Sequence, residues 1–302
     1  MSEYLFERVG QSAYIAEEIT TPSLSFWEDV WRRFCINKVA TLGLVILALL
    51  AAFAILGPII SSYTYFETNL SWKNHIPCKE YWFGTDDLGR DMFTRTAVGA
   101  RISLFVGITA AFIDLLIGVL WGGIAGLAGG KIDNLMMRIA DILYAIPYLL
   151  VVILLMVVLG SGLVPILIAL TIIGWIGMAR IVRGGIIQMR QQEFIQAAIA
   201  LGAGRRRILF KHLIPNVMGP IIVTMTLTIP TAIFAEAFLS FLGLGVQAPM
   251  ASWGTMASDG LAAMRYYPWR LFFPAVFISV TMLAFNLVGD GLRDAIDPKL
   301  RS

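Results

Sequence analysis

Six long and nearly uncharged apolar runs constrain this chain of 302 residues more than any other feature. A helix of about 18 apolar residues is long enough to cross the hydrocarbon core of a bilayer. The runs occupy residues 39–60, 102–128, 142–159, 163–178, 217–242 and 272–289. The composition agrees, since 58% of the residues are hydrophobic and 14% are charged, against about 45–50% and about 25% in soluble proteins. We therefore predict an all-α integral membrane protein with six transmembrane helices.

The lysines and arginines predict how these helices are oriented. With the N-terminus in the cytoplasm, 16 of the 23 basic residues fall in cytoplasmic segments, as the positive-inside rule requires. Both termini are then cytoplasmic. Cys35 and Cys78 fall on opposite faces of the membrane and cannot pair within one chain. A net charge of +3 is too small to indicate nucleic-acid binding.

The spans divide the chain into segments. Residues 1–38 form a cytoplasmic N-terminal segment, in which residues 25–37 read as an amphipathic helix that opens with a Ser25-x-x-Glu28 capping box. We expect this helix to lie in the membrane interface. The first transmembrane helix, 39–60, leads to an extracytoplasmic segment, 61–101. A transmembrane core at 102–290 and a cytoplasmic tail at 291–302 complete the prediction.

The second run carries a stripe of small residues with an acid beside it. Four glycines stand four residues apart, at Gly118, Gly122, Gly126 and Gly130. Such a stripe lets two helices approach closely inside a membrane. Asp114 lies one step earlier on the same ridge, and we interpret it as a packed polar group hydrogen-bonded to a neighbouring helix. A place in a translocation path is the alternative, because acids within membrane spans are often functional.

Two further acids lie in or beside the spans. For Glu236, in the fifth run, a pore-facing role and a structural hydrogen bond to a neighbouring helix are equally weighted. Asp141 follows Arg138 by three residues, so we expect an i,i+3 ion pair, with a path role as the alternative. Pro230 predicts a kink in the fifth helix.

Signatures of enzymatic chemistry are absent from the sequence. The two histidines, His75 and His212, fall on opposite sides of the membrane, and no Cys/His cluster has metal-ligand spacing. The Gly130-Lys131 pair does not make a phosphate loop, because Ala125 replaces its first glycine and Ile132 its Ser or Thr. We expect this chain to hold no catalytic site, metal or cofactor. Any ATP-driven work requires a partner.

The longest cytoplasmic segment predicts two short helices joined at a glycine. Residues 193–202 read as a helix that ends at Gly202, where we expect a left-handed backbone. Residues 203–213 read as a second, basic helix that stops before Pro215. Several apolar side chains remain where a solvated loop would need none. This elbow therefore predicts a docking surface. Its apolar residues are Phe194, Ile195, Ala197, Ala198 and Leu201.

The spacing of this elbow resembles the "EAA" loop of ABC importer permeases. The matching positions are Gln196, Ala197, Ala198, Gly202, His212 and Pro215. Gln196 stands where the family has glutamate, and His212 where it has an aliphatic residue. The resemblance implies that the elbow docks an ATPase subunit.

Three further blocks resemble the C-type permease of oligopeptide and dipeptide importers. They cover residues 83–91, 239–245 and 286–298, and the whole resemblance extends from about residue 26 to 299. It implies the type I ABC importer permease fold in a bacterial or archaeal cytoplasmic membrane. It also implies four kinds of partner: the bilayer, a homologous second permease, two ATPase subunits that use ATP and Mg, and an external solute-binding protein. Nickel, glutathione and other small-solute importers share this permease type and remain alternative cargoes.

A proton-coupled secondary transporter that uses Asp114, Asp141 and Glu236 as a relay is the rival from another class. The absence of evident inverted repeats and the presence of the elbow disfavour it. A purely structural scaffold would leave the intramembrane acids unexplained. The sequence therefore predicts an ATP-driven importer subunit.

Overall fold

The computed structural model describes residues 25–297, and most of them are helical. The described part of the chain holds no β-strand, only an isolated bridge between Thr85 and Asp91. Most of the predicted N-terminal segment, residues 1–24, and the end of the predicted tail, residues 298–302, lie outside the described residues. The all-α prediction is confirmed.

Five described helices are long and apolar enough to cross a membrane. They are α2 (Lys38–Ile60), α3 (Met92–Ala128), α6 (Leu163–Arg190), α10 (Met218–Phe241) and α12 (Trp269–Ile296). The pair formed by α4 (Gly130–Ala145) and α5 (Tyr148–Leu159) is bent by 80° and passes the same test as a single broken span. Counted in this way, the described helices give the six predicted spans.

The third predicted span is not one helix. We expected residues 142–159 to be continuous, but the helix breaks at Ile146 and Pro147, where Ile146 has an extended backbone with ψ 130°. Proline has no N–H to donate and disfavours helical geometry in the residue before it. An apolar run of suitable length concealed this break, because length and hydropathy alone do not register one proline.

Several helices extend beyond their apolar runs. The second span begins at Met92 instead of residue 102, because the Asp91 carboxylate caps the helix and accepts from the N–H groups of Phe93 (3.3 Å) and Thr94 (3.0 Å). The fourth reaches Arg190, and α12 continues to Ile296, so residues 291–296 of the predicted cytoplasmic tail are helical. A helix can continue beyond its apolar run, because its backbone hydrogen bonds do not require apolar side chains.

Helix α3 is central to the bundle, since it packs against α6, α10 and α2. Helix α12 packs against α2, α10 and the short α11 (Trp253–Ala263). The predicted amphipathic helix is α1 (Phe26–Ile36), and it packs on α12 and α2. The capping contact at its start is present, since the Ser25 N–H donates to the Glu28 carboxylate at 2.8 Å.

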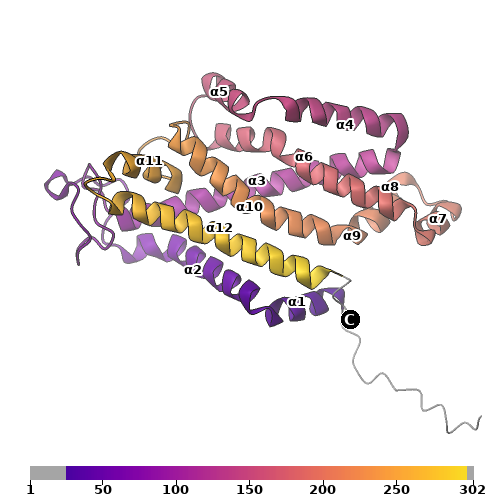
Figure 1. The fold of residues 1–302 in the computed structure, drawn as a ribbon, viewed down its shortest axis with the longest axis horizontal. Coiled ribbons are helices and arrows are strands. Elements are labelled where there is room, and N and C mark those ends of the chain that lie inside the picture. Colours follow the sequence, from indigo (N-terminus) through magenta and orange to yellow (C-terminus); the bar gives the residue numbers. More distant parts are fainter. Residues whose placement is uncertain (1–24, 298–302) are drawn as a thin grey trace, which may run out of the picture.

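The bundle is elongated and its two ends differ (Figure 1). We call the end with residues 61–91, η2 (Leu70–Trp72) and α11 the loop end. We call the other end, which carries α7 (Glu193–Ala200), α8 (Arg205–Arg207), η3 (Ile208–Leu213) and α9 (Ile214–Asn216), the elbow end. Helix α1 and the close of α12 lie toward the elbow end (Figure 1). The two described ends of the chain therefore share one side of the bundle.

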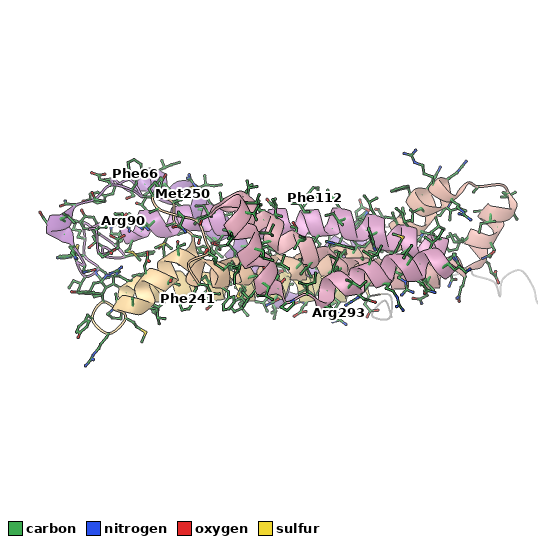
Figure 2. All side chains as sticks on the ribbon, turned by 90° about the horizontal axis from the view of Figure 1, so that it is seen from above. Phe66, Arg90, Phe112, Phe241, Met250 and Arg293 are labelled. Atoms are coloured by element: carbon green, nitrogen blue, oxygen red, sulfur yellow. The ribbon has the colours of Figure 1, made fainter. Side chains whose placement is uncertain are left out.

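Figure 2 shows the same two ends of the bundle with labelled residues. Phe66, Arg90 and Met250 lie at the loop end, whereas Arg293 lies toward the elbow end (Figure 2). Between them, Phe112 projects from the side of the bundle and is 51% exposed. Large exposed apolar side chains along this middle zone are expected where lipid is the solvent. Cys35 and Cys78 are both free.

A charged cluster organises the loop end. The guanidinium of Arg90 donates to the Asp86 carboxylate at 2.6 Å, and Arg95 of α3 lies 3.4 Å from the same carboxylate. Arg270, at the start of α12, lies 3.3 Å from Asp87. These pairs connect the block at residues 83–91 to two helices and hold the loop against the bundle.

Candidate functional site

The elbow has the backbone that its glycine predicts. Helix α7 ends at Ala200, and Gly202 follows with φ +83°, in the left-handed region. The N–H of Gly202 donates to the Ile199 carbonyl (2.9 Å), and the N–H of Ala203 donates to the Ala198 carbonyl (3.0 Å). These bonds satisfy carbonyls that the helix end would leave unpaired. The chain therefore reverses sharply after α7.

The elbow is anchored through Ile195 and Gln196 and exposes other apolar side chains. Ile195 is fully buried among apolar residues of α6 and η3. Gln196 is tied down through its amide, which donates to the Arg190 carbonyl at 3.0 Å. Phe194 is 46% exposed and Leu201 is 89% exposed. Large apolar side chains are therefore exposed on an anchored turn.

The second half of the elbow differs from the prediction. We expected a helix over residues 203–213 that stops before Pro215, but helical backbone runs from Arg205 to Asn216 through the wide π turn η3. The π turn places the Ile214 N–H on the Leu209 carbonyl, which shifts the hydrogen-bonding frame before the proline. The side chain of Asn216 then donates to the His212 carbonyl at 2.6 Å. Pro215 is accommodated here because the π turn has already shifted the pattern of helical hydrogen bonds.

The glycine stripe lies against α6 at three of its four positions. A Cβ on Gly118 would come within 2.6 Å of the Met178 Cβ, one on Gly122 within 2.2 Å of the Ala179 carbonyl oxygen, and one on Gly126 within 3.0 Å of Arg183 and Ile186 atoms. The two backbones are thus in direct contact. Gly130 does not share this role, because it begins α4 with φ +55° and meets nothing within 4 Å. The stripe ends with α3.

Asp114 continues the same ridge, but without the expected hydrogen bond. It faces Gly174 of α6, where an added Cβ would lie 2.3 Å from its Oδ2. The side chain is 4% exposed, and Oδ1 has no hydrogen-bond partner among the described residues. Asp114 borders a cavity of about 390 Å³ between α3, α6, α10 and the α4–α5 pair. The interpretation of a group hydrogen-bonded across helices is wrong for this residue.

Glu236 lies in the opposite situation, because two hydroxyl groups donate to its carboxylate. It is completely buried, and its carboxylate accepts from the hydroxyls of Ser240 (2.7 Å) and Ser103 (3.1 Å). Ser252, at the start of α11, donates to Ser240 at 3.3 Å. The Trp253 N–H adds a contact to Ser103 at 3.4 Å. Three helices thus meet on one carboxylate.

Asp141 pairs with a different arginine from the one expected. Its carboxylate accepts from Arg180 of α6 at 2.8 Å, instead of pairing with Arg138 on its own helix. Both side chains are well exposed. Sequence reasoning missed a closer pair, in which Arg183 donates through two nitrogens to the Asp133 carboxylate at 2.5 and 2.7 Å. The charges of α4 and α6 gave a signal for pairing, but only the packing of these helices selects the partners.

Two family models match this chain. One is described as "Binding-protein-dependent transport system inner membrane component" and matches residues 118–302. The other is described as "N-terminal TM domain of oligopeptide transport permease C" and matches residues 25–77. Together they leave unmatched only the residues before 25 and those between 77 and 118.

Curated relatives match along nearly the whole chain. It is 62% identical to the oligopeptide transport system permease protein OppC of Bacillus subtilis (strain 168), over 98% of this chain and 97% of that protein. It is 58% identical to the dipeptide transport system permease protein DppC of the same organism, over 95% and 90%. Among solved structures, the MetNI methionine ABC transporter in inward-facing conformations matches with a TM-score of 0.54 and 19% identity, over 65% of this chain and 94% of that one. This last likeness concerns the fold.

Proposed function

This chain belongs to the family of inner membrane components of binding-protein-dependent transport systems, and from that premise we propose that it is the C-type permease subunit of an ABC importer for oligopeptides or dipeptides. The near full-length similarity to OppC and DppC proteins supports a peptide cargo. Nickel, glutathione or another small solute in the same machine is the alternative. Transport in this reading draws on ATP and Mg held by partner subunits.

The proposed assembly contains this chain, a homologous second permease, two ATPase subunits and an external solute-binding protein. The elbow end faces the cytoplasm of a bacterial or archaeal cell, and the loop end faces outward. Both termini are then cytoplasmic, since α1 and the close of α12 lie toward the elbow end (Figure 1). This orientation agrees with the excess of Lys and Arg in the same segments.

The observation that carries this proposal is the anchored and outward-facing elbow. Its interior side chain, Ile195, is buried among α6 and η3, so force applied to α7 reaches the bundle directly. Phe194, Ala197 and Leu201 face away from the chain. ATP-driven closure of the ATPases would displace this knob and switch the paired permeases between inward-open and outward-open states.

We assign two of the three acids to the architecture. Glu236 links α3, α10 and the start of α11 through hydroxyl donors. Asp141 links α4 to α6 through Arg180. Neither arrangement leaves a relay of free carboxylates across the bundle, which is what proton-coupled transport would need.

The function is tested by peptide uptake into vesicles that contain the complete assembly. We expect uptake to require ATP, both ATPase subunits and the binding protein, and to be insensitive to a proton-gradient uncoupler. Collapse of uptake on addition of the uncoupler, with ATP still present, would favour the secondary transporter instead. Uptake of nickel or glutathione but not of peptides would retain the machine and change its cargo.

The elbow is tested by a matched pair of substitutions, Gly202→Asp and Gly204→Asp. Both add one charge at positions where an added Cβ meets nothing within 4 Å. Gly202 has φ +83°, whereas Gly204 has φ −67° at the N-cap of α8, which suits Asp. We expect Gly202→Asp to insert and pair with the second permease but to retain little ATPase attachment and little substrate-stimulated hydrolysis. Gly204→Asp should retain most of both, and normal transport by Gly202→Asp would refute the docking role.

Crosslinking tests the orientation independently. In a chain whose Cys35 and Cys78 are replaced by serine, Ala198→Cys is expected to crosslink to an ATPase subunit. Ala262→Cys, on α11 at the loop end, is the control and is expected to react only with reagents added from outside. Labelling of Ala198→Cys solely from outside would reverse the topology.

A further inference from the structure

One cavity is open at the side of the bundle and is lined by buried polar atoms that lack hydrogen-bond partners among the described residues. It measures about 390 Å³ and is bordered by α3, α6, α10 and the α4–α5 pair. At its rim, Gly174, Gly177 and Thr231 are exposed, so the cavity opens along the side of the bundle. Asp114 is 4% exposed at the same cavity.

Two of the polar side chains at this cavity have an atom that the described part of the chain leaves without a hydrogen bond. Within the described residues, neither the Asp114 Oδ1 nor the buried hydroxyl of Tyr148 has a hydrogen-bond partner. No ion pair found in that same part of the chain involves Asp114. Arg180, which lies over the Tyr144 ring at 4.6 Å, is already paired with Asp141. A carboxylate in this setting lacks the compensation that buried charges normally have.

The neighbouring helix preserves the space around the carboxylate. Gly174 faces Asp114, and a Cβ there would come within 2.3 Å of Oδ2 and 2.9 Å of Oδ1. Asp114 also lies well inside the apolar part of α3, where an acid is costly unless it meets a partner. Residues 25–297 thus hold an acid in place within the membrane and pair it with no Lys or Arg.

The remaining oxygen atoms suit one kind of cation. Thr228 and Thr231 donate their hydroxyl protons to backbone carbonyls at 2.8 and 2.6 Å, so their lone pairs are left as acceptors. A calcium or magnesium ion needs about six oxygen ligands, and no group of three or more His, Cys, Asp or Glu that could hold a metal ion occurs among the described residues. An ammonium group has three N–H donors and needs only one carboxylate with hydroxyl acceptors beside it.

We propose that Asp114, with the hydroxyls of Tyr148, Thr228 and Thr231, is a transient binding site for the positively charged amino group of the solute as it crosses the membrane. The inference rests on the proposed function, because a peptide's free amino terminus has a pKa of about 8 and is largely protonated at pH 7. The site would bind the solute transiently, part of the way across the membrane.

The test uses the complete transporter in vesicles, with tri-alanine and N-acetyl-tri-alanine as probes. Each is supplied at a concentration that saturates the binding protein, as checked by the fluorescence of that protein. The variants are Asp114→Asn, which removes the charge, and Gly174→Ala, which displaces the carboxylate. Gly184→Ala is the control on the same helix, because its Cβ meets nothing within 4 Å.

We expect Asp114→Asn and Gly174→Ala to lower tri-alanine uptake by about tenfold or more, the size of one lost charge-assisted hydrogen bond. Gly184→Ala should stay within about twofold of the original rate. The ATPase response to the loaded binding protein should persist in all three variants, which a disrupted assembly would not allow. If the acetylated peptide is delivered, its uptake should be slower in the original protein and unchanged by Asp114→Asn.

Tri-alanine uptake at the original rate by Asp114→Asn would overturn the inference while leaving the proposed function intact. If tri-alanine uptake falls when sodium is removed from the medium, and acetylation of the peptide has no effect, Asp114 binds an inorganic cation. That result would overturn the inference as well. Failure of the original transporter to import any peptide with ATP present would remove the proposed function, and this site with it.

Discussion

Replacing Gly122 with alanine is expected to weaken the contact between α3 and α6 by about 1–2 kcal/mol. The added Cβ would lie 2.2 Å from the Ala179 carbonyl oxygen, and 3.0 Å from the Ala179 Cα and carbonyl carbon. This is about 1.2 Å inside the 3.4 Å at which ordinary contact begins. Since the obstructing atoms are backbone, no side chain can rotate away and the two helices must separate.

The magnitude follows from two opposing effects. Overpacking against a fixed backbone costs about 1–3 kcal/mol, and separation also loosens the contacts at Gly118 and Gly126. Alanine recovers about 0.5–1 kcal/mol, because glycine is a poor residue inside a helix. The matched control is Gly184→Ala on α6, which meets nothing within 4 Å and should be neutral or slightly stabilising.

Unfolding by SDS in lipid bicelles measures this difference. Trp121 of α3 and Trp175 of α6 have ring centroids 5.0 Å apart, so the separation of these two helices contributes to the fluorescence change of the eight tryptophans in the chain. We expect Gly122→Ala to unfold at lower SDS than the original protein and Gly184→Ala to unfold at the same SDS or higher. Equal unfolding of the two variants would refute the reasoning that close backbone contact holds α3 to α6.

Three further outcomes are expected from the polar residues. Glu236→Gln should retain most transport, since an amide keeps hydrogen bonding with Ser103 and Ser240, whereas Glu236→Ala should cost about 1–3 kcal/mol of stability per hydroxyl left unpaired; equal stability of the two variants in SDS unfolding would contradict this. Asp141→Asn should change stability by less than about 1 kcal/mol, because its pair with Arg180 is exposed, but Asp133→Asn should cost more, because that carboxylate is buried; the same unfolding assay decides between them. Trp253→Phe should cost about 1–2 kcal/mol by removing the bond from Nε1 to the Thr96 carbonyl (2.9 Å), measured as a lower thermal midpoint of the purified assembly, and an unchanged midpoint would count against that bond.

The sequence by itself determined the features that depend on neighbours along the chain. Length and hydropathy placed five continuous spans, because any long apolar segment in a bilayer must satisfy its own backbone as a helix, but they did not register the break in the third predicted span. Gly202 revealed its left-handed turn, and Gly118, Gly122 and Gly126 their close contact, because only glycine removes the steric obstacle at such positions. The first half of the elbow followed from the same local logic, but the π turn in its second half did not.

Only the tertiary structure decided where the polar side chains find partners. Glu236 accepts from Ser103, which lies far away in the sequence, and Asp141 pairs with Arg180 instead of its helical neighbour. The sequence indicates that each of these acids needs a hydrogen-bond or ion-pair partner. It does not say which donor that partner is, because this depends on how the helices pack. Asp114 is the sharpest case, since its neighbours on α6 and α10 leave it unpaired. Burial imposes the requirement for a partner, and the three-dimensional packing of the helices selects it.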